Sequence, residues 1–173
     1  MIYFTSDTHF NHDRDFIYVP RGFSSIKEAD DTIINNWCSL VSNDDDIYVL
    51  GDFFLGTDFD YIDNVLHKLT GKIHLIIGNH DTNAKLKFYA NYNNIVEITY
   101  ATIIKYKNKI FYLSHYPTIV ADAFIQNKQP MYNLFGHTHS KDLYYNNNPY
   151  LYNVALDAHD NYPISIDTII ANI

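Results

Sequence analysis

Short apolar runs alternate with amphipathic stretches along the first half of the chain, and this alternation predicts an α/β fold. The compact apolar runs typical of buried strands are residues 2–6, 46–50 and 73–77. Between the first two runs, apolar residues recur at helical spacing. Ser25 and Glu28 fit a capping box just before this stretch, which predicts a helix over residues 26–42.

A second helix is predicted where Ile62, Val65 and Leu69 recur, and Gly71 marks its end. Beyond residue 94 the chain becomes richer in short β-prone runs. These runs are residues 95–98, 102–106, 110–114, 132–135, 143–145 and 151–156. A hairpin turn is predicted at residues 107–109, a second turn at residues 146–149, and a short helix near residues 120–126.

The chain of 173 residues, with 47% apolar side chains, has the size of a single globular domain over residues 1–173. Its net charge of −8 disfavours binding to duplex nucleic acid, because the phosphate backbone would be repelled. No apolar run approaches the roughly 18 residues of a membrane span, and the start lacks the features of a signal peptide. The single cysteine, Cys38, is expected on a buried helix face, so we expect a cytoplasmic protein with no membrane partner.

Five short polar motifs each follow a predicted strand, in loops where a rigid sheet can direct side chains to a common point. They are Asp7-Thr8-His9, Gly51-Asp52, Gly78-Asn79-His80-Asp81, Ser114-His115 and Gly136-His137-Thr138-His139. An Asp-x-His triplet is expected about once by chance in such a chain, whereas Gly-Asn-His-Asp is expected roughly 0.004 times and Gly-His-x-His about 0.02 times. The later motifs therefore carry most of the information.

The side chains of these motifs offer only oxygen and nitrogen as metal ligands. The carboxylates, the amide and the imidazoles are those of Asp7, Asp52, Asn79, His9, His115, His137 and His139. This set is too large for one tetrahedral ion, but it suits two ions about 3.5 to 4 Å apart that share a carboxylate and a bridging hydroxide. Because such a pair lowers the pKa of the shared water and orients a phosphate, the motifs predict a dinuclear hydrolytic site.

Each motif also has an ordinary interpretation when it stands alone. Asp-x-His is often a strand end followed by a surface histidine, Gly-Asp is common in turns, and Gly-His-x-His can be two exposed residues of an extended segment. Two alternatives from other functional classes therefore remain open. One is a metal-binding scaffold for a protein partner, and the other is a structural α/β domain with incidental histidines.

In this order, from residue 5 to about residue 139, the motifs resemble those of the calcineurin-like metallophosphoesterase superfamily. The resemblance implies a four-layer α/β/β/α sandwich of two mixed β-sheets flanked by helices, with the motifs in loops at one end. The residues that it implies for the first metal are Asp7, His9, Asp52 and His139. The residues that it implies for the second metal are Asp52, Asn79, His115 and His137, so that Asp52 bridges the two ions.

The resemblance also implies that His80 acts on the substrate, either by binding the phosphate or by protonating the leaving oxygen as a general acid. Asp81 is expected to orient the His80 ring, and Asn79 and His12 are expected to contact the substrate. Candidates for a phosphate clamp, from their place in the loop that follows, are Arg14 and Arg21. Candidates for supporting groups behind the ligands are Asn153, Asp157 and His159.

Two motifs differ from those of the superfamily's Ser/Thr protein phosphatases, and the differences argue against that activity. Those enzymes carry Asp-Arg-Gly after the second motif and Gly-Asn-His-Glu at the third, whereas here the second motif continues into Phe53-Phe54 and the third ends in Asp81. A closer similarity is to small bacterial and phage members that begin Asp-x-His-Phe-Gly-His. In this chain Asn11 stands in place of that glycine. The replacement affects the expected backbone conformation of this loop and not the metal ligands.

We therefore expect a phosphodiesterase that hydrolyses a small nucleotide-like substrate through a metal-bridging hydroxide. A small ligand is favoured because the chain is acidic and has no insertion large enough for a cap domain. The alternative reaction on the same metals is that of a phosphomonoesterase or nucleotide pyrophosphatase. Two divalent ions are expected as cofactors, with manganese first and iron, nickel or zinc as alternatives, because the ligands are oxygen and imidazole.

Overall fold

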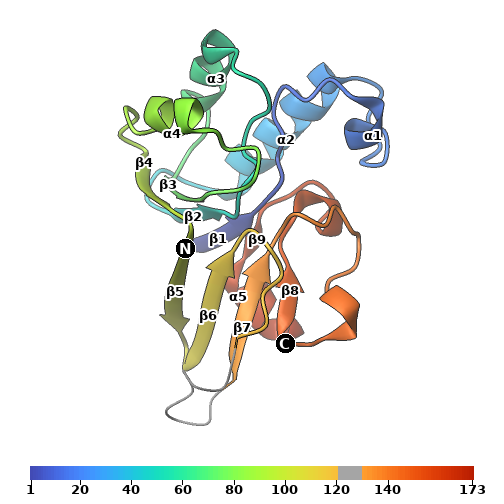
Figure 1. Ribbon diagram of the computed structural model, residues 1–173, viewed down its shortest axis with the longest axis vertical. Helices are drawn as coiled ribbons and strands as arrows, with labels where there is room; N and C mark the ends of the chain where they lie inside the picture. Colours follow the sequence, from blue (N-terminus) through green and yellow to red (C-terminus); the bar gives the residue numbers. More distant parts are fainter. Residues whose placement is uncertain (121–129) are drawn as a thin grey trace.

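The apolar runs of the first half form a five-stranded mixed sheet in the computed structural model, which describes residues 1–120 and 130–173. In spatial order its strands are β4 (Ile95–Thr99), β3 (Lys72–Ile76), β2 (Asp46–Val49), β1 (Ile2–Thr5) and β9 (Ile164–Ser165). β1 to β4 run parallel, and β9 pairs antiparallel with β1 (Figure 1). The parallel strands therefore end at one common edge of the sheet.

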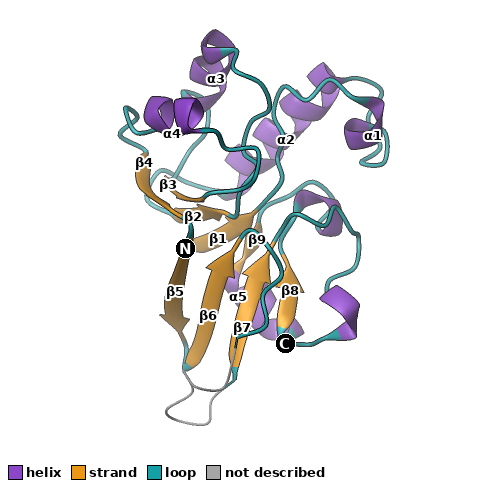
Figure 2. Ribbon diagram, viewed as in Figure 1, coloured by secondary structure: helices purple, strands orange, loops and turns teal. Residues whose placement is uncertain are grey.

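Helices cover one face of this sheet, as Figure 2 shows. They are α2 (Ile26–Leu40), α3 (Phe59–Leu66) and α4 (Asn83–Tyr89), and the short α1 (Asp15–Tyr18) precedes them. Trp37 of α2, Ile47 of β2 and Leu75 of β3 lie fully buried in the core between helices and sheet. The Trp37 indole also donates to the Thr70 carbonyl at 2.8 Å, so this large side chain is buried without an unpaired polar atom.

The start of α2 follows the capping pattern with one change of partner. Ser25 is the N-cap, and its hydroxyl accepts from the Glu28 amide at 3.2 Å. The Glu28 carboxylate accepts from the Ser24 amide at 2.8 Å, one residue earlier than a capping box requires. The helix start is therefore confirmed, with Ser24 rather than Ser25 as the residue to which Glu28 reaches back.

The second half of the chain forms a four-stranded sheet in the order β5-β6-β7-β8. Its strands are β5 (Ala101–Tyr106), β6 (Lys109–Ser114), β7 (Met131–Phe135) and β8 (Leu151–Asn153). β5 and β6 form an antiparallel hairpin, whereas β6, β7 and β8 run parallel. The predicted turn is confirmed, with Lys107 at φ 44° and Asn108 at φ 62°, the positive values that a two-residue hairpin loop of this twist requires.

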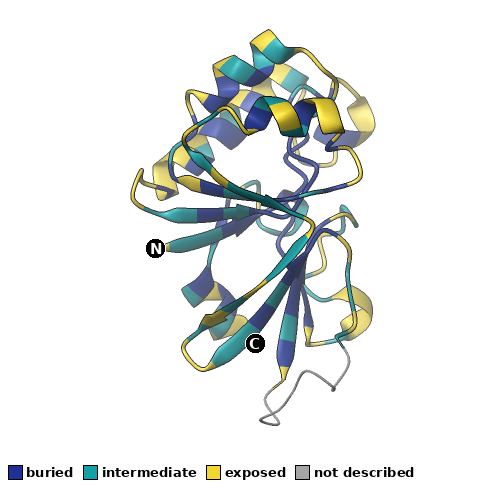
Figure 3. Cartoon of the chain, turned by 60° about the vertical axis from the view of Figure 1, so that its left-hand side comes forward, coloured by how far each residue is buried: buried dark blue, intermediate teal, exposed yellow. Residues whose placement is uncertain are grey.

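The two mixed sheets face each other across a second apolar core, and helices flank them, which confirms the α/β sandwich (Figure 3). Phe4 and Ile76 of the first sheet meet Leu113 and Tyr152 of the second in this core, and α5 (Ile166–Asn172) adds Ile169. All of these side chains are fully buried. The packing fixes the distance between the strand ends of the two sheets, which is where the sequence motifs lie.

Some elements differ from the sequence-based expectation. The hydropathy pattern does not predict α1, α4, β9 or α5, because none of them exceeds 7 residues and such short segments show too little periodicity. The strand predicted over residues 143–145 is wrong: only Tyr144 pairs, in an isolated bridge to Tyr152, and Tyr145–Asn147 is a 3-10 helix. The helix predicted near residues 120–126 falls, from residue 121 on, outside the described residues.

Cys38 is exposed, which corrects the expectation of a buried thiol. The buried face of α2 runs through Ala29, Ile33 and Trp37, and a residue one position after Trp37 is turned about a quarter of the way around the helix from that face. Among the described residues, no helix is long and apolar enough to cross a bilayer.

Asp30 of α2 is expected to make the free energy of unfolding depend on pH. Its carboxylate is buried, accepts from the Asn11 amide at 2.8 Å and from the Tyr61 hydroxyl, and burial raises its pKa to about 6. Because the ordinary pKa is 3.8, the native state binds more protons than the unfolded chain between these two values. Stability should therefore fall by roughly 3 kcal/mol as pH rises through that window.

Urea titrations at a series of pH values measure this dependence. Asp30→Asn should show a smaller decrease in stability across the window, while Asp31→Asn, at an exposed position next to it, should keep the full decrease. An undiminished decrease in Asp30→Asn would contradict the assignment to Asp30.

Candidate metal site

All five motifs lie at the carboxyl ends of strands, where the two sheets meet. Asp7, Asp52 and Asn79 follow β1, β2 and β3 of the first sheet, and His115 and His137 follow β6 and β7 of the second. Backbone hydrogen bonds tie neighbouring motif loops together, and one example is the 3.0 Å bond from the Asp7 amide to the Gly51 carbonyl. The parallel arrangement thus brings side chains more than 100 residues apart in sequence to one place.

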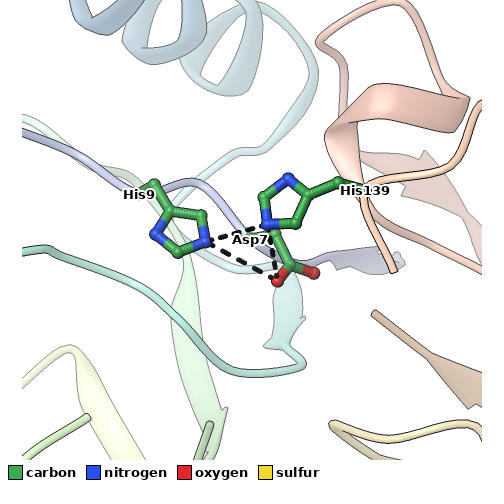
Figure 4. Close-up of side chains that lie close together, drawn as sticks. All are labelled: Asp7, His9 and His139. Carbon is green, nitrogen blue, oxygen red and sulfur yellow. Dashed lines mark hydrogen bonds and ion pairs between the residues drawn. The ribbon is translucent and has the colours of Figure 1, made fainter. Parts of the chain in front are cut away.

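The first cluster consists of Asp7, His9 and His139, whose ligand atoms all lie within 4.8 Å of one another. Figure 4 shows the three side chains pointing at one another. The Asp7 Oδ1 atom is 3.8 Å from His9 Nε2 and 3.7 Å from His139 Nε2, and the two Nε2 atoms are 3.1 Å apart. One oxygen and two nitrogens therefore converge on a single point.

The carboxylate of Asp7 carries the strongest sign that a cation belongs at this point. Asp7 is fully buried, and its Oδ2 atom accepts from the His137 amide at 2.7 Å. Its Oδ1 atom is buried without a hydrogen-bond partner. Burial raises the pKa of this carboxyl, which means that the protein environment alone disfavours its charge. A divalent ion between Oδ1 and the two imidazoles would satisfy the unpaired oxygen, so these residues fit such an ion.

The second cluster consists of Asp52, His115 and His137, again with ligand atoms within 4.8 Å of one another. His115 Nδ1 lies 2.8 Å from the Leu50 carbonyl, which can only accept, so the proton of a neutral ring is on Nδ1 and Nε2 carries a lone pair. Yet Nε2 is 2.9 Å from the side-chain oxygen of Asn79, another acceptor. Two lone pairs facing each other at this distance also fit a bound cation.

Asp52 contacts both clusters. Its Oδ2 atom is 3.6 Å from His9 Nε2 in the first cluster and 3.5 Å from His115 Nε2 in the second. Its Oδ1 atom accepts from the His80 amide at 2.8 Å, which fixes the plane of the carboxylate. Asp52 is thus the carboxylate that two neighbouring ions would share.

Neutral imidazole is the form of histidine that binds a metal ion, and burial favours it here. Burial lowers the pKa of His9 to about 2 and also lowers the pKa of His137. His139 differs, since burial lowers its pKa but the hydrogen bond to Asp157 and the charge of Asp7 outweigh this and raise it.

Several residues of the site have backbone dihedral angles in the left-handed region, which residues other than glycine rarely adopt. Left-handed φ values occur at Asp7 (55°), His9 (48°), Asp52 (53°), His137 (68°) and His139 (48°). Each such residue costs of order 1 kcal/mol, and it persists only where the surrounding structure enforces it. Asn11, which stands where the small bacterial and phage members have glycine, also has a left-handed φ of 64°, a conformation that asparagine tolerates.

The glycines of the motifs leave room for the ligands. A Cβ atom at Gly51 would lie 2.4 Å from His115 Nδ1, one at Gly78 would lie 2.3 Å from Asp52 Oδ1, and one at Gly136 would lie 1.9 Å from Ser6 Oγ. All three distances are shorter than any contact that a real Cβ makes, so a side chain at these positions would displace a ligand or the strand that carries it.

Gly136→Ala is therefore expected to weaken both folding and metal binding. Because its Cβ would also lie 2.3 Å from Asp7 Oδ2, we expect a loss of about 3 kcal/mol in the free energy of unfolding, together with weaker metal binding. Gly56→Ala is the control, since a Cβ there meets nothing within 4 Å and only the left-handed φ of 72° opposes it, at about 1 kcal/mol. Equal losses in the two variants, measured by chemical denaturation, would contradict the steric argument.

His80 lies at the open side of the site. Its side chain is 46% exposed, and its Nε2 atom is 4.0 Å from Asp52 Oδ2. Asp81, expected to orient the His80 ring, has other partners: its carboxylate accepts from the Gly78 and Asp52 amides, each at 2.9 Å. It also accepts from the Phe53 amide at 3.3 Å, so Asp81 joins the loops of the second and third motifs.

His12 is buried beside the first cluster, with its ring 5.2 Å from that of His9, and burial lowers its pKa. Arg14 is exposed on the loop that follows. Arg21, a candidate phosphate clamp, is buried and directed away from solvent: its guanidinium forms an ion pair with Asp157 at 2.8 Å. The structure thus leaves Arg14 free for a substrate and corrects the expectation for Arg21.

Of the three candidate supporting groups, two hold the chain around the fifth motif. Asn153 is fully buried and donates to the Ser140 carbonyl at 3.0 Å and to the Asp142 carbonyl at 3.1 Å, just after His139. His159 lies with Nε2 2.8 Å from the Asn153 carbonyl. The third candidate, Asp157, touches a ligand directly, with its Oδ2 atom 3.3 Å from His139 Nδ1.

Sequence reasoning missed Lys85, a buried lysine in α4. Its ammonium donates to the Phe54 carbonyl at 2.5 Å, at the end of the second motif loop. Burial lowers its pKa, and the nearby charges of Asp81 and Asp52 act in the opposite direction. To place this lysine near the motifs, one would have to predict α4 from the sequence. The apolar pattern of α4 is too short for that, because the helix has only 7 residues.

Comparison with known proteins agrees with this geometry. The family model described as the calcineurin-like phosphoesterase superfamily domain matches residues 1–154. An uncharacterized protein of Methanocaldococcus jannaschii is 32% identical over 178 residues, which cover 98% of this chain and 89% of that protein. The Gene 66 protein of Mycobacterium phage L5 is 33% identical over 81 residues, which cover 46% of this chain and 39% of that protein.

A solved structure supports the fold. The crystal structure of a protein of unknown function from Aquifex aeolicus superposes with a TM-score of 0.72 at 24% identity, and the match covers 100% of this chain and 99% of that one. The family match spans all five motifs, and the two clusters lie where those motifs meet. The chain belongs to the calcineurin-like phosphoesterase superfamily.

Proposed function

We propose that the chain is a dinuclear metal-dependent phosphodiesterase that hydrolyses a small nucleotide-like ester. The observation that carries the proposal is the position of Asp52, whose Oδ2 atom lies within 3.6 Å of an imidazole nitrogen in each cluster. A carboxylate shared between two ligand sets is the arrangement that two-ion hydrolysis requires.

Residues of both sheets would hold the two ions. Asp7, His9 and His139 would hold the first, Asn79, His115 and His137 the second, and Asp52 both. When bound, such a pair lowers the pKa of a shared water and neutralises the charge that develops on the phosphate. Manganese is our first choice, with iron, nickel or zinc as alternatives, because the donors are carboxylate, amide and imidazole without a thiolate.

His80 is the group that we assign to proton transfer. Its ring is the more accessible neighbour of Asp52, with nearly half of the side chain exposed, and so it can meet a substrate that approaches from solvent. A protonated His80 would donate to the leaving oxygen, or to a phosphate oxygen, as the ester bond breaks. His12, whose ring lies 5.2 Å from that of His9, and Asn79, whose side-chain oxygen lies 2.9 Å from His115 Nε2, are assigned to substrate contacts.

The preference for a small diester rests on charge and access. The chain has a net charge of −8, which opposes a long polyanion, whereas a short ester brings few charges to the site. His80 and the exposed ring of His137 leave the site accessible. A proton donor next to the site is of most use when the leaving group is a poor one, as in a nucleotide ester.

The test compares two substrates on manganese-loaded protein. Bis-p-nitrophenyl phosphate should be hydrolysed faster than p-nitrophenyl phosphate, and a chelator should abolish both rates. Turnover of the monoester alone would replace the proposal by the phosphomonoesterase alternative. Absence of turnover of either substrate, with two ions bound, would favour the binding scaffold instead.

A further inference from the structure

Arg21 and Asp157 form a buried ion pair behind the first cluster. Arg21 Nε donates to Asp157 Oδ1 at 3.0 Å and Nη2 donates to Oδ2 at 2.8 Å, which is the two-pronged geometry of a strong pair. The side chains are only 2% and 7% exposed, respectively. The two residues are separated by 136 positions, so the pair joins the turn between α1 and α2 to the 3-10 helix Leu156–Ala158.

Both members of the pair touch the metal-binding loops. Arg21 Nη2 donates to the Asp7 carbonyl at 2.7 Å, and Nη1 donates to the Thr8 carbonyl at 3.3 Å. Asp157 Oδ2 lies 3.3 Å from His139 Nδ1. The pair thus holds the backbone that carries one ligand and the ring of another.

The contact to His139 fixes which nitrogen of the ring is free. A carboxylate accepts a hydrogen bond from Nδ1–H, and in a neutral ring with its proton on Nδ1 the lone pair is on Nε2. His139 Nε2 is the atom that faces Asp7 Oδ1 and His9 Nε2 in the first cluster. Arg21 Nη2 also lies 3.5 Å from Nδ1, but Asp157 Oδ2 is nearer to that atom, at 3.3 Å. The pair therefore favours the ring direction and the tautomer that metal binding at this point requires.

Stability alone is a weak reason for such a pair. Removing two charges from water is costly, and apolar residues of similar size often replace a buried ion pair without loss of stability. What apolar residues do not replace is the orientation of the His139 ring and of the Asp7 carbonyl. Asp157 also lies beyond residues 1–154, to which the family model extends, so that match gives it no role.

We propose that Arg21 and Asp157 are positioning residues that orient His139 and the Asp7 loop for the ion held by the first cluster. This inference rests on the metal site of the proposed function and makes a narrower claim. It predicts that the two ions respond differently when the pair is disrupted, because Asp157 contacts His139 and no ligand of the second cluster among the described residues.

Titration calorimetry of the metal-free chain with Mn²⁺ tests this without measuring activity. In Asp157→Asn, one of the two ions should bind about 10- to 100-fold more weakly, while the other keeps its affinity. Asp160→Asn is the matched control, because Asp160 is an exposed aspartate three positions further on. It should bind both ions as the wild type does.

A double variant separates positioning from folding. Arg21→Met combined with Asp157→Leu removes both charges together, so it leaves no unpaired buried charge and should fold. If the pair positions the ligands, this variant still binds one ion 10- to 100-fold more weakly than the wild type. That is the loss of metal affinity expected when a supporting carboxylate is removed. Wild-type affinity for both ions in a folded double variant, equal weakening of both ions, or failure of the double variant to fold would each overturn the inference.

The outcome also separates this inference from the proposed function. If the wild-type chain binds no Mn²⁺, the metal site itself is refuted. If the wild type binds two ions and Asp157→Asn binds them equally well, only the positioning role fails. The tautomer adds a second readout: in the metal-free chain, nitrogen NMR should find the neutral His139 ring protonated at Nδ1 in the wild type, and should find that state lost or mixed in the double variant.

Discussion

Asp52→Asn should lower phosphodiester hydrolysis by roughly a thousandfold or more and weaken the binding of both metal ions. The substitution keeps the size of the side chain but removes its charge. Asp52 Oδ2 faces His9 in one cluster and His115 in the other, so a single change affects both ligand sets. Among the described residues, no other carboxylate lies within 4 Å of an imidazole nitrogen in both clusters.

The measurement combines initial rates on bis-p-nitrophenyl phosphate with Mn²⁺ titration of the same samples. Asp44→Asn is a suitable control, because Asp44 is exposed and lies at the opposite end of β2. It should leave both the rate and the two affinities unchanged. Loss of a single ion in Asp52→Asn, with the other bound normally, would show that Asp52 belongs to one site only.

His80→Ala should spare both metal ions and still reduce turnover, by about 100- to 10,000-fold. Its backbone amide, which donates to Asp52 Oδ1 at 2.8 Å, is retained in alanine, so the bridging carboxylate keeps its orientation. What is removed is an imidazole with a 46% exposed side chain near the reacting centre. The loss should therefore appear in the rate and not in metal affinity.

The leaving group distinguishes the two roles open to His80. If His80 protonates the leaving oxygen, the loss in His80→Ala is larger for a diester with an alkyl leaving group than for one with p-nitrophenol, which leaves without help. If His80 only binds the phosphate, the loss is the same for both. His67→Ala, at an exposed histidine of no assigned role, is the control and should keep the full rate. Full activity in His80→Ala would refute both roles.

Much of the fold can be predicted from the sequence because its strands are short, apolar and bounded by clear turns. Residues 2–6, 46–50 and 73–77 lie in β1, β2 and β3 with boundaries within one residue. The composition of residues 95–114 indicated the three strands β4, β5 and β6. The pattern is strong in these segments because each strand is buried on at least one face.

The elements that escaped prediction are short or depend on distant partners. β9 has 2 residues and is defined only by its pairing with β1 at the other end of the chain. Residues 143–145 have the apolar character of a strand, but two consecutive asparagines with left-handed backbone, Asn146 and Asn147, turn the chain away from an extended course. Local propensity does not contain such tertiary information.

The candidate site was more predictable in its ligands than in the residues around them. Each ligand directly follows a strand, so the order of the motifs already implies that they meet. Arg21 was misjudged because a loop arginine is exposed in most proteins, and its burial depends on Asp157, 136 residues away. Asp81 was misjudged for a similar reason, since its partners are backbone amides of another loop, which no sequence pattern marks.

The most direct test of the account is the number of metal ions that the chain binds. Metal-free protein would be equilibrated with Mn²⁺, separated from free metal by gel filtration and analysed by mass spectrometry for bound manganese. The account predicts two ions per chain, as the two clusters joined by Asp52 require. A folded chain that binds one ion or none, at Mn²⁺ concentrations well above those that saturate ordinary protein sites, would contradict it.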